Sequence, residues 1–169
     1  MIYLATVVHD LRKKEDSKAQ ALRTVAELHK EWNQQEMYEA RERAYQFIYN
    51  HPCKSLKEPE TAERKDPELQ YVWVVIGFFE RLAALLKNKQ ITDELFADTF
   101  GQIFSWWDEF LFQEKLFDGW ASHKRIEMLR SNLASQLKNE QALIARWRKE
   151  ATEYKHPDEN AERVNARPA

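Results

Sequence analysis

Apolar side chains recur at every third or fourth position over most of this chain of 169 residues, and little interrupts the pattern. This spacing places apolar side chains along one face of an α-helix. Only three glycines and five prolines are present, too few for the many turns of a β-rich fold. The sequence therefore predicts an all-α fold: an antiparallel helical bundle of about five helices with a long C-terminal helix.

Breaks in the period divide the chain into three parts. A helical extension, residues 1–18, is apolar at first and then charged; a bundle domain, residues 19–155, and a polar tail, residues 156–169, follow it. Lys14 and Lys18 interrupt the apolar face, so we expect the first helix in two pieces. The expected helices cover residues 1–32, 34–50, 67–89, 93–111 and 120–155, with a loop over 51–65.

Three residues carry signals about individual helices. Thr92 is followed by two acidic residues, and its hydroxyl is expected to cap the helix that begins there. Asn33 is expected to cap the helix that begins at Gln34. Gly77 lies inside the third expected helix, where glycine costs about 1 kcal/mol against alanine. We therefore expect a close helix–helix crossing at Gly77.

Net charge and cysteine content indicate which partners and which cellular compartment suit the protein. A formal net charge of −2 gives no overall field that would attract nucleic acid or anionic lipid. Cys53 is the only cysteine, which is typical of a reducing compartment. No apolar run reaches the ~20 residues of a membrane span. We expect a cytoplasmic protein, with residues 1–8 as the segment suited to contact with the inner face of a membrane.

The residues that carry chemistry do not form a recognisable catalytic or metal motif. His9 and Asp10 match a dipeptide of helical metal-dependent phosphohydrolases, but no histidine precedes them to complete that set. The chain contains no pair of Glu-x-x-His motifs of the kind that holds two metal ions in a bundle. Three scattered glycines do not make a phosphate-binding loop. We predict no catalytic, cofactor-binding or metal-binding residues, and a protein that is not an enzyme.

Two charged residues interrupt otherwise apolar helix faces. Arg41 lies in the inner face of the second expected helix, and Glu80 in that of the third. A single buried charge costs several kcal/mol. We therefore predict that Arg41 and Glu80 meet as a buried ion pair that sets the helix register. The alternative is a polar pocket for a small ligand at the same place.

Two groups of side chains are candidates for an interaction surface. Aromatic residues cover more than one face of the fourth expected helix, and basic residues line one side of the last. Most aromatic residues in such a pattern belong to the core, and most rows of basic residues on a helix simply face solvent. The candidate residues are Trp106, Trp107, Phe110 and Phe112, and then Lys124, Lys138, Arg146 and Lys149.

Three segments in the middle of the chain carry a family resemblance. They are Ile76-Gly-Phe-Phe-Glu-Arg-Leu82, Lys89-Gln-Ile-Thr-Asp-Glu-Leu-Phe96 and Phe100-Gly-Gln-Ile103, with Trp107 after them. Over roughly residues 20–135 the chain resembles a bacterial family of small helical proteins of unknown function. The resemblance implies a cytoplasmic bundle, which in that family often follows an N-terminal membrane span; here only residues 1–8 stand in its place. The family has no established activity, so no catalytic residue or cofactor is implied.

These observations favour a non-enzymatic interaction or scaffold module in a bacterial or phage cytosol, with a protein partner or self-association. Two alternatives remain open. One is an accessory protein in phage–host defence or counter-defence that acts on a nucleic-acid or nucleoprotein complex through the basic residues. The other is a small-ligand-binding protein or an enzyme that uses the region of Arg41 and Glu80.

Overall fold

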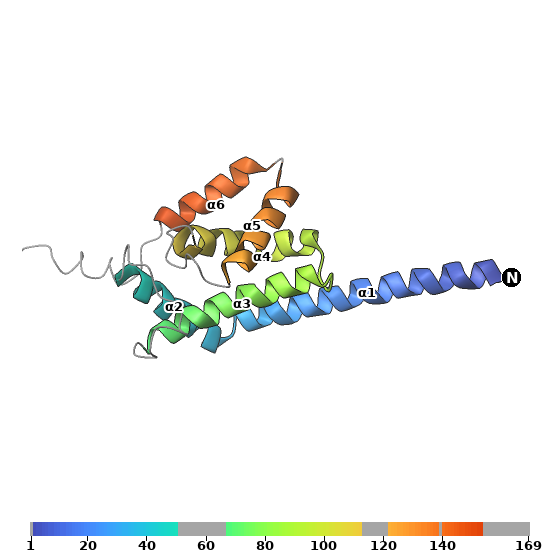
Figure 1. The fold of residues 1–169 in the computed structure, drawn as a ribbon, viewed down its shortest axis with the longest axis horizontal. Coiled ribbons are helices and arrows are strands. Elements are labelled where there is room, and N and C mark those ends of the chain that lie inside the picture. Colours follow the sequence, from blue (N-terminus) through green and yellow to red (C-terminus); the bar gives the residue numbers. More distant parts are fainter. Residues whose placement is uncertain (1, 51–66, 113–121, 139, 154–169) are drawn as a thin grey trace, which may run out of the picture.

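The computed structural model describes residues 2–50, 67–112, 122–138 and 140–153, and every regular element in these ranges is helical (Figure 1). The all-α prediction is therefore confirmed for the described residues. Six α-helices pack against one another, and a short π-helical segment follows the fourth. The elements are α1 (Ile2–Trp32), α2 (Gln35–Asn50), α3 (Leu69–Lys87), α4 (Asp93–Trp107), η1 (Asp108–Phe112), α5 (His123–Gln136) and α6 (Gln141–Glu153).

Helix α3 lies at the centre of the fold, in contact with α2, α4 and α5. Its apolar residues surround most of the helix, which is the pattern of a helix packed on several sides. By length and composition, α3 is also the one helix among the described residues that could cross a membrane. In this fold 44% of that apolar stretch is buried inside the protein.

Aromatic rings fill the space between α3 and its neighbours. Phe78 and Phe79 of α3 are fully buried and meet edge to face, with their ring centroids 5.7 Å apart. Phe100 and Phe104 of α4 pack edge to face against them at 5.8 and 5.6 Å. Aromatic pairs in this geometry contribute about 0.5–1.5 kcal/mol each beyond the burial of their area. This cluster fixes α3 against α4.

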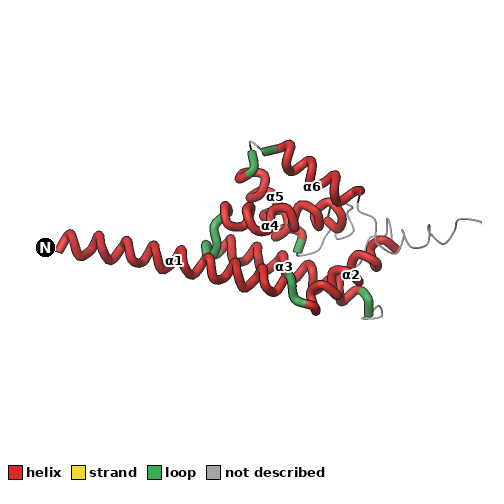
Figure 2. The backbone as a smooth tube through the Cα atoms, turned by 180° about the vertical axis from the view of Figure 1, so that it is seen from behind, coloured by secondary structure: helices red, strands yellow, loops and turns green. Residues whose placement is uncertain are grey.

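Helix α1 is one uninterrupted helix, so the expected division into two pieces is wrong. Its C-terminal part packs on the bundle through Ala21, Val25, Leu28 and Trp32, all buried. The side chains of residues 11–20 are exposed, and the N-terminal end of α1 projects beyond the other helices in both views (Figures 1 and 2). Further along, Lys14, Ser17 and Lys18 line a cavity with residues of the α3–α4 turn and the start of α4. Lysine and glutamate favour helix even without packing, and no glycine or proline interrupts this stretch. Residues 2–18 of the expected extension are therefore the first part of α1.

The expected long C-terminal helix is also wrong, because two helices occupy its place. Helix α5 ends at Gln136, and the N–H of Glu140 binds the carbonyl of Leu137 in a turn before α6 begins. The break lets Leu133 of α5 and Trp147 of α6 both pack against α4 at Gly101. A Cβ at Gly101 would lie 2.9 Å from Leu133 Cδ1 and 3.6 Å from Trp147 Cζ3.

The close approach predicted at Gly77 is therefore found at Gly101 instead. Apart from the adjacent turns of its own helix, no described residue has an atom within 4 Å of the position that a Cβ would take at Gly77. The cap at Thr92 is confirmed, because its Oγ1 accepts a hydrogen bond from the N–H of Leu95 at 3.2 Å. Asn33 acts at the opposite end from the one predicted: its Nδ2 donates to the carbonyl of His29 at 2.7 Å and closes α1. The expected loop over 51–65 and tail over 156–169 lie outside the described residues.

Candidate binding site

Arg41 and Glu80 do not form the predicted pair in the described part of the chain. Glu80 of α3 accepts a hydrogen bond from Arg125 of α5, with Nη1 and Oε1 3.0 Å apart. Arg41 of α2 lies instead against the end of α1, where its guanidinium carbon is 4.5 Å from the centre of the Trp32 ring. Sequence periodicity gave the faces of the two helices, but it could not show that α5 supplies a nearer cation to Glu80.

The guanidinium group of Arg41 has aromatic neighbours. Its carbon lies 5.8 Å from the Tyr38 ring centre as well as close to Trp32, and its Nε is buried with no hydrogen-bond partner among the described residues. Burial lowers the pKa of Arg41 from its ordinary value, and the neighbouring Glu42 acts in the opposite direction. The interaction that holds the cation here is therefore mainly with ring faces.

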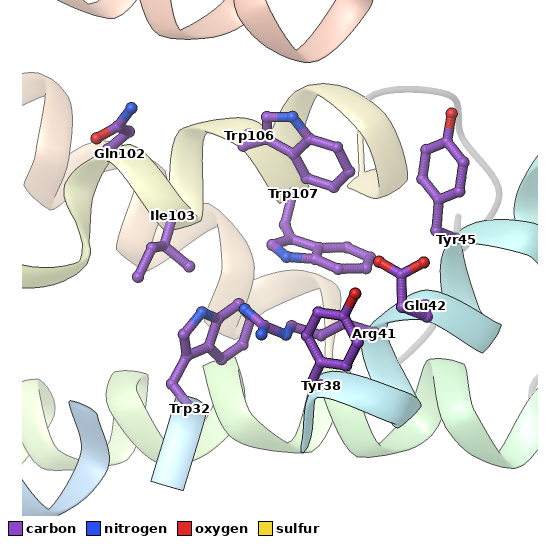
Figure 3. A pocket seen from close by; sticks show the side chains of 9 residues that line it. All are labelled: Trp32, Tyr38, Arg41, Glu42, Tyr45, Gln102, Ile103, Trp106 and Trp107. Atoms are coloured by element: carbon purple, nitrogen blue, oxygen red, sulfur yellow. The ribbon is translucent and has the colours of Figure 1, made fainter. Parts of the chain in front are cut away.

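Arg41 lines a pocket between the end of α1, helix α2 and helix α4 (Figure 3). The cavity has a volume of about 330 Å³, at the lower end of the sizes usual for small-molecule sites. Its walls are largely aromatic, with Arg41 and Glu42 as the charged residues among them. The residues that line it, called the aromatic pocket from here on, are Trp32, Tyr38, Arg41, Glu42, Tyr45, Gln102, Ile103, Trp106 and Trp107.

The aromatic surface predicted on the fourth helix continues onto α2. Trp107 is buried at 4% exposure, whereas Trp106 and Phe110 are half-buried. Tyr45 of α2 stacks on Phe110 with ring centroids 4.6 Å apart, and it also stacks on Tyr49 at 6.1 Å. Tyr49 is 56% exposed. The candidates Trp106, Trp107 and Phe110 are thus brought together, while the side chain of Phe112 lies outside the described ones.

Sequence reasoning missed the contribution of α2 to this surface. Tyr38, Tyr45 and Tyr49 are spaced by seven and then four residues, which places them on one face of a helix. The spacing alone therefore indicates that these three tyrosines share one face of the helix. Only the packing of α2 beside α4 showed that these tyrosines face the tryptophans.

A buried ion pair is present, but between residues that sequence reasoning did not pair. Arg130 of α5 donates to both carboxylate oxygens of Asp108, with Nε–Oδ2 at 3.0 Å and Nη2–Oδ1 at 2.7 Å. Asp108 is 2% exposed, and its hydrogen bonds raise the pKa of Arg130. Asp108 follows Gly101 by seven residues and Phe104 by four, so an α-helical period places it on the buried side of α4. The π-helical segment η1 begins at this residue.

The basic candidates do not lie along a single helix. Lys124 is on α5, Lys138 lies beyond its end, and Arg146 and Lys149 are on α6; all four are exposed. Arg146 lies 3.3 Å from Glu150 of the same helix. The turn between α5 and α6 therefore removes the continuous line expected from one long helix.

No cluster of three or more histidine, cysteine, aspartate or glutamate side chains with the spacing of a metal site occurs among the described residues. Comparison with known proteins adds no identity: no family model, no curated protein and no solved structure matches this chain. The functional argument therefore rests on the aromatic pocket and its surroundings.

Proposed function

We propose that this protein is a non-enzymatic binding module, in which the helices form an antiparallel scaffold for the aromatic pocket. A partner protein places a side chain or chain end in the pocket and covers the exposed rings beside it. The observation that carries this proposal is the convergence of Trp32, Tyr38, Tyr45, Trp106 and Trp107 on one cavity.

The chemistry of the pocket is that of a protein recognition site. Tryptophan, tyrosine and arginine are the residue types most enriched among the residues that dominate binding energy at interfaces. Two tyrosines on this face, Tyr38 and Tyr49, expose half or more of their surface. Rings exposed next to a concave apolar wall lose water-contacting area when a partner covers them, and this favours association.

Two features of the sequence support the cellular setting that we propose. A single cysteine and the resemblance to small bacterial proteins support a bacterial or phage cytosol, and residues 1–8 are the segment we assign to membrane contact. Self-association is the alternative to a different protein partner. Light scattering of the isolated chain distinguishes a monomer from an oligomer.

Site-specific photo-crosslinking in the native host tests this proposal. A photoreactive amino acid at Tyr38, on the rim of the pocket, is compared with one at Leu22, which is 48% exposed on α1. We expect a crosslinked partner from position 38 alone, and its loss when Trp106→Ala is added. Equal crosslinking from both positions, or crosslinking that survives Trp106→Ala, would contradict the proposal.

One observation favours a second candidate, a protein that binds a small ligand. A partly buried arginine with an unpartnered Nε lines a cavity of about 330 Å³. A ligand-dependent rise in melting temperature would support this candidate. The nucleic-acid alternative requires binding that weakens steeply with salt, because each phosphate contact releases counterions.

A further inference from the structure

We propose that the aromatic pocket selects a carboxylate group joined to a flat aromatic body. This inference rests on the proposed function, because it names the chemical class that the same pocket recognises. It combines three observations: a cation in the wall, aromatic rings around the cavity, and a cavity of limited size.

Arg41 supplies the charge that selects the carboxylate. Its guanidinium group lies between the rings of Trp32 and Tyr38 at the edge of the cavity (Figure 3). Because Nε is buried without a partner, the terminal nitrogens are the donors that a ligand reaches. Burial has already removed part of the water around this cation. A ligand carboxylate compensates for that loss, since guanidinium and carboxylate form strong, planar, charge-assisted hydrogen bonds.

The rings select the body of the ligand. Trp32 and Trp107 meet edge to face with ring centroids 6.4 Å apart, and Trp106 and Ile103 also line the cavity, so these side chains form one continuous wall (Figure 3). Aromatic pairs favour offset or edge-to-face contacts, so a flat ring system placed against this wall gains more contact energy than a branched aliphatic group. A volume of about 330 Å³ leaves room for a fused ring and its carboxylate.

Aromatic walls also attract cations, so a cationic ligand is the alternative to be excluded. In this pocket Arg41 already occupies the space beside Trp32 and Tyr38. A second cation placed there would be repelled by the guanidinium group. Glu42 also lines the pocket and acts in the opposite direction, weakening the attraction for an anion. Replacement of Glu42 by glutamine is therefore expected to strengthen binding of the acid.

Three probes with one ring system and different charges test the proposal: 2-naphthylacetate, its neutral amide, and 2-(2-naphthyl)ethylamine. Binding to the full chain is measured by ligand-observed NMR and calorimetry. We expect the acid to bind at least tenfold more tightly than the amide or the amine. Arg41→Gln should remove this preference, Arg41→Lys should keep part of it, and Glu42→Gln should increase it.

The outcomes separate this inference from the proposed function. Equal binding of all three probes, abolished by Trp106→Ala, would leave the pocket as a binding site and overturn carboxylate selection. Tightest binding of the amine would overturn it as well. Absence of binding by every probe would count against both proposals. Circular dichroism of each variant checks that it is folded, and Glu42→Gln tests the electrostatics without removal of the cation.

The same carboxylate chemistry could reach the pocket from a free acid or from the C-terminal residue of a partner chain. A peptide Gly-Gly-Ser-Gly-Trp with a free carboxylate and the same peptide with an amidated end distinguish these sources. Tighter binding of the free-carboxylate peptide than of 2-naphthylacetate identifies a chain end. The reverse order identifies a small acid.

Discussion

Two partly buried arginines of this molecule have opposite surroundings. Arg130 donates to both oxygens of Asp108, whereas Arg41 lies on the rings of Trp32 and Tyr38 with its Nε unpartnered. The pKa of Arg130 is raised, mainly by its hydrogen bonds to Asp108. The pKa of Arg41 is lowered, mainly by burial.

The contrast separates a structural cation from a cation suited to binding. A guanidinium group paired with a buried carboxylate has its donors occupied and holds two elements in register. A guanidinium group on aromatic faces keeps its donors for a ligand, and it lines a cavity that can hold one. The four predictions below test this distinction, beginning with the largest expected effect.

Replacement of Asp108 by alanine should lower the free energy of unfolding by about 3 kcal/mol, because Arg130 loses its buried partner. The effect is expected at the lower end of the usual range, since Arg130 is 29% exposed and also pairs with Glu127. Urea unfolding followed by circular dichroism measures it. The double variant Asp108→Leu with Arg130→Met should recover most of the loss, because no unpaired charge remains. A cost below about 1 kcal/mol for Asp108→Ala would place this pair among weak surface pairs.

Replacement of Arg41 by methionine should lower the free energy of unfolding by only about 1 kcal/mol, the usual worth of a partly desolvated cation–π contact. No carboxylate is orphaned by this change, because Glu80 is paired with Arg125. The same urea titration compares it with Arg130→Met. If the two variants lose equal stability, the division into a structural and a binding arginine fails.

Replacement of Gly77 by alanine should raise the free energy of unfolding by about 0.5–1 kcal/mol, the difference in helix propensity between the two residues. Among the described residues, none outside the adjacent helix turns has an atom within 4 Å of the added Cβ. This variant sharpens the comparison by providing a more stable background for the Asp108 series. Gly101→Ala is its control: the added Cβ would lie 2.9 Å from Leu133 Cδ1, so little or no gain is expected. Thermal melting of both variants measures the difference. A higher melting temperature for Gly101→Ala but not for Gly77→Ala would refute the assignment of the close contact to Gly101.

Replacement of Glu80 by glutamine should have the smallest effect, about 0.5 kcal/mol, because its partner Arg125 is 58% exposed. The difference from the parent protein should shrink further in 1 M sodium chloride, which screens exposed charges. The effect of Asp108→Ala should be much less sensitive to salt. Melting curves at low and high salt provide the measurement, and the opposite salt dependence would reverse the assignment of surface and buried pairs.

The fold class and most helix positions could be predicted from the sequence because they depend on local pattern. The apolar period defined α2, α3 and α4, and Thr92 marked the start of α4 correctly. Sequence patterns did not predict the features that depend on contacts between distant segments. The packing of both Leu133 of α5 and Trp147 of α6 on Gly101 of α4 is such a contact, and it accompanies the break after α5.

The candidate site was predicted in part for the same reason. Helix spacing identified Arg41, Trp106, Trp107 and Phe110 as unusual, but it could not assign partners across helices. Glu80 was predicted to pair with Arg41, but its partner is Arg125 of α5. The sequence pattern does not show that α5 packs beside α3. Asp108 was not paired with Arg130, because helix spacing does not show which residues of α5 come next to the end of α4.

The uninterrupted α1 has a mechanical consequence. From Ile2 to Lys13, before the cavity that Lys14 lines with the α3–α4 turn, the helix rises by about 17 Å at 1.5 Å per residue. The molecule combines a rod with a rounded body, so its rotational diffusion in solution is anisotropic. If a membrane, filament or neighbouring subunit were attached at the first turn of α1, the length of the projecting helix would set its distance from the aromatic pocket.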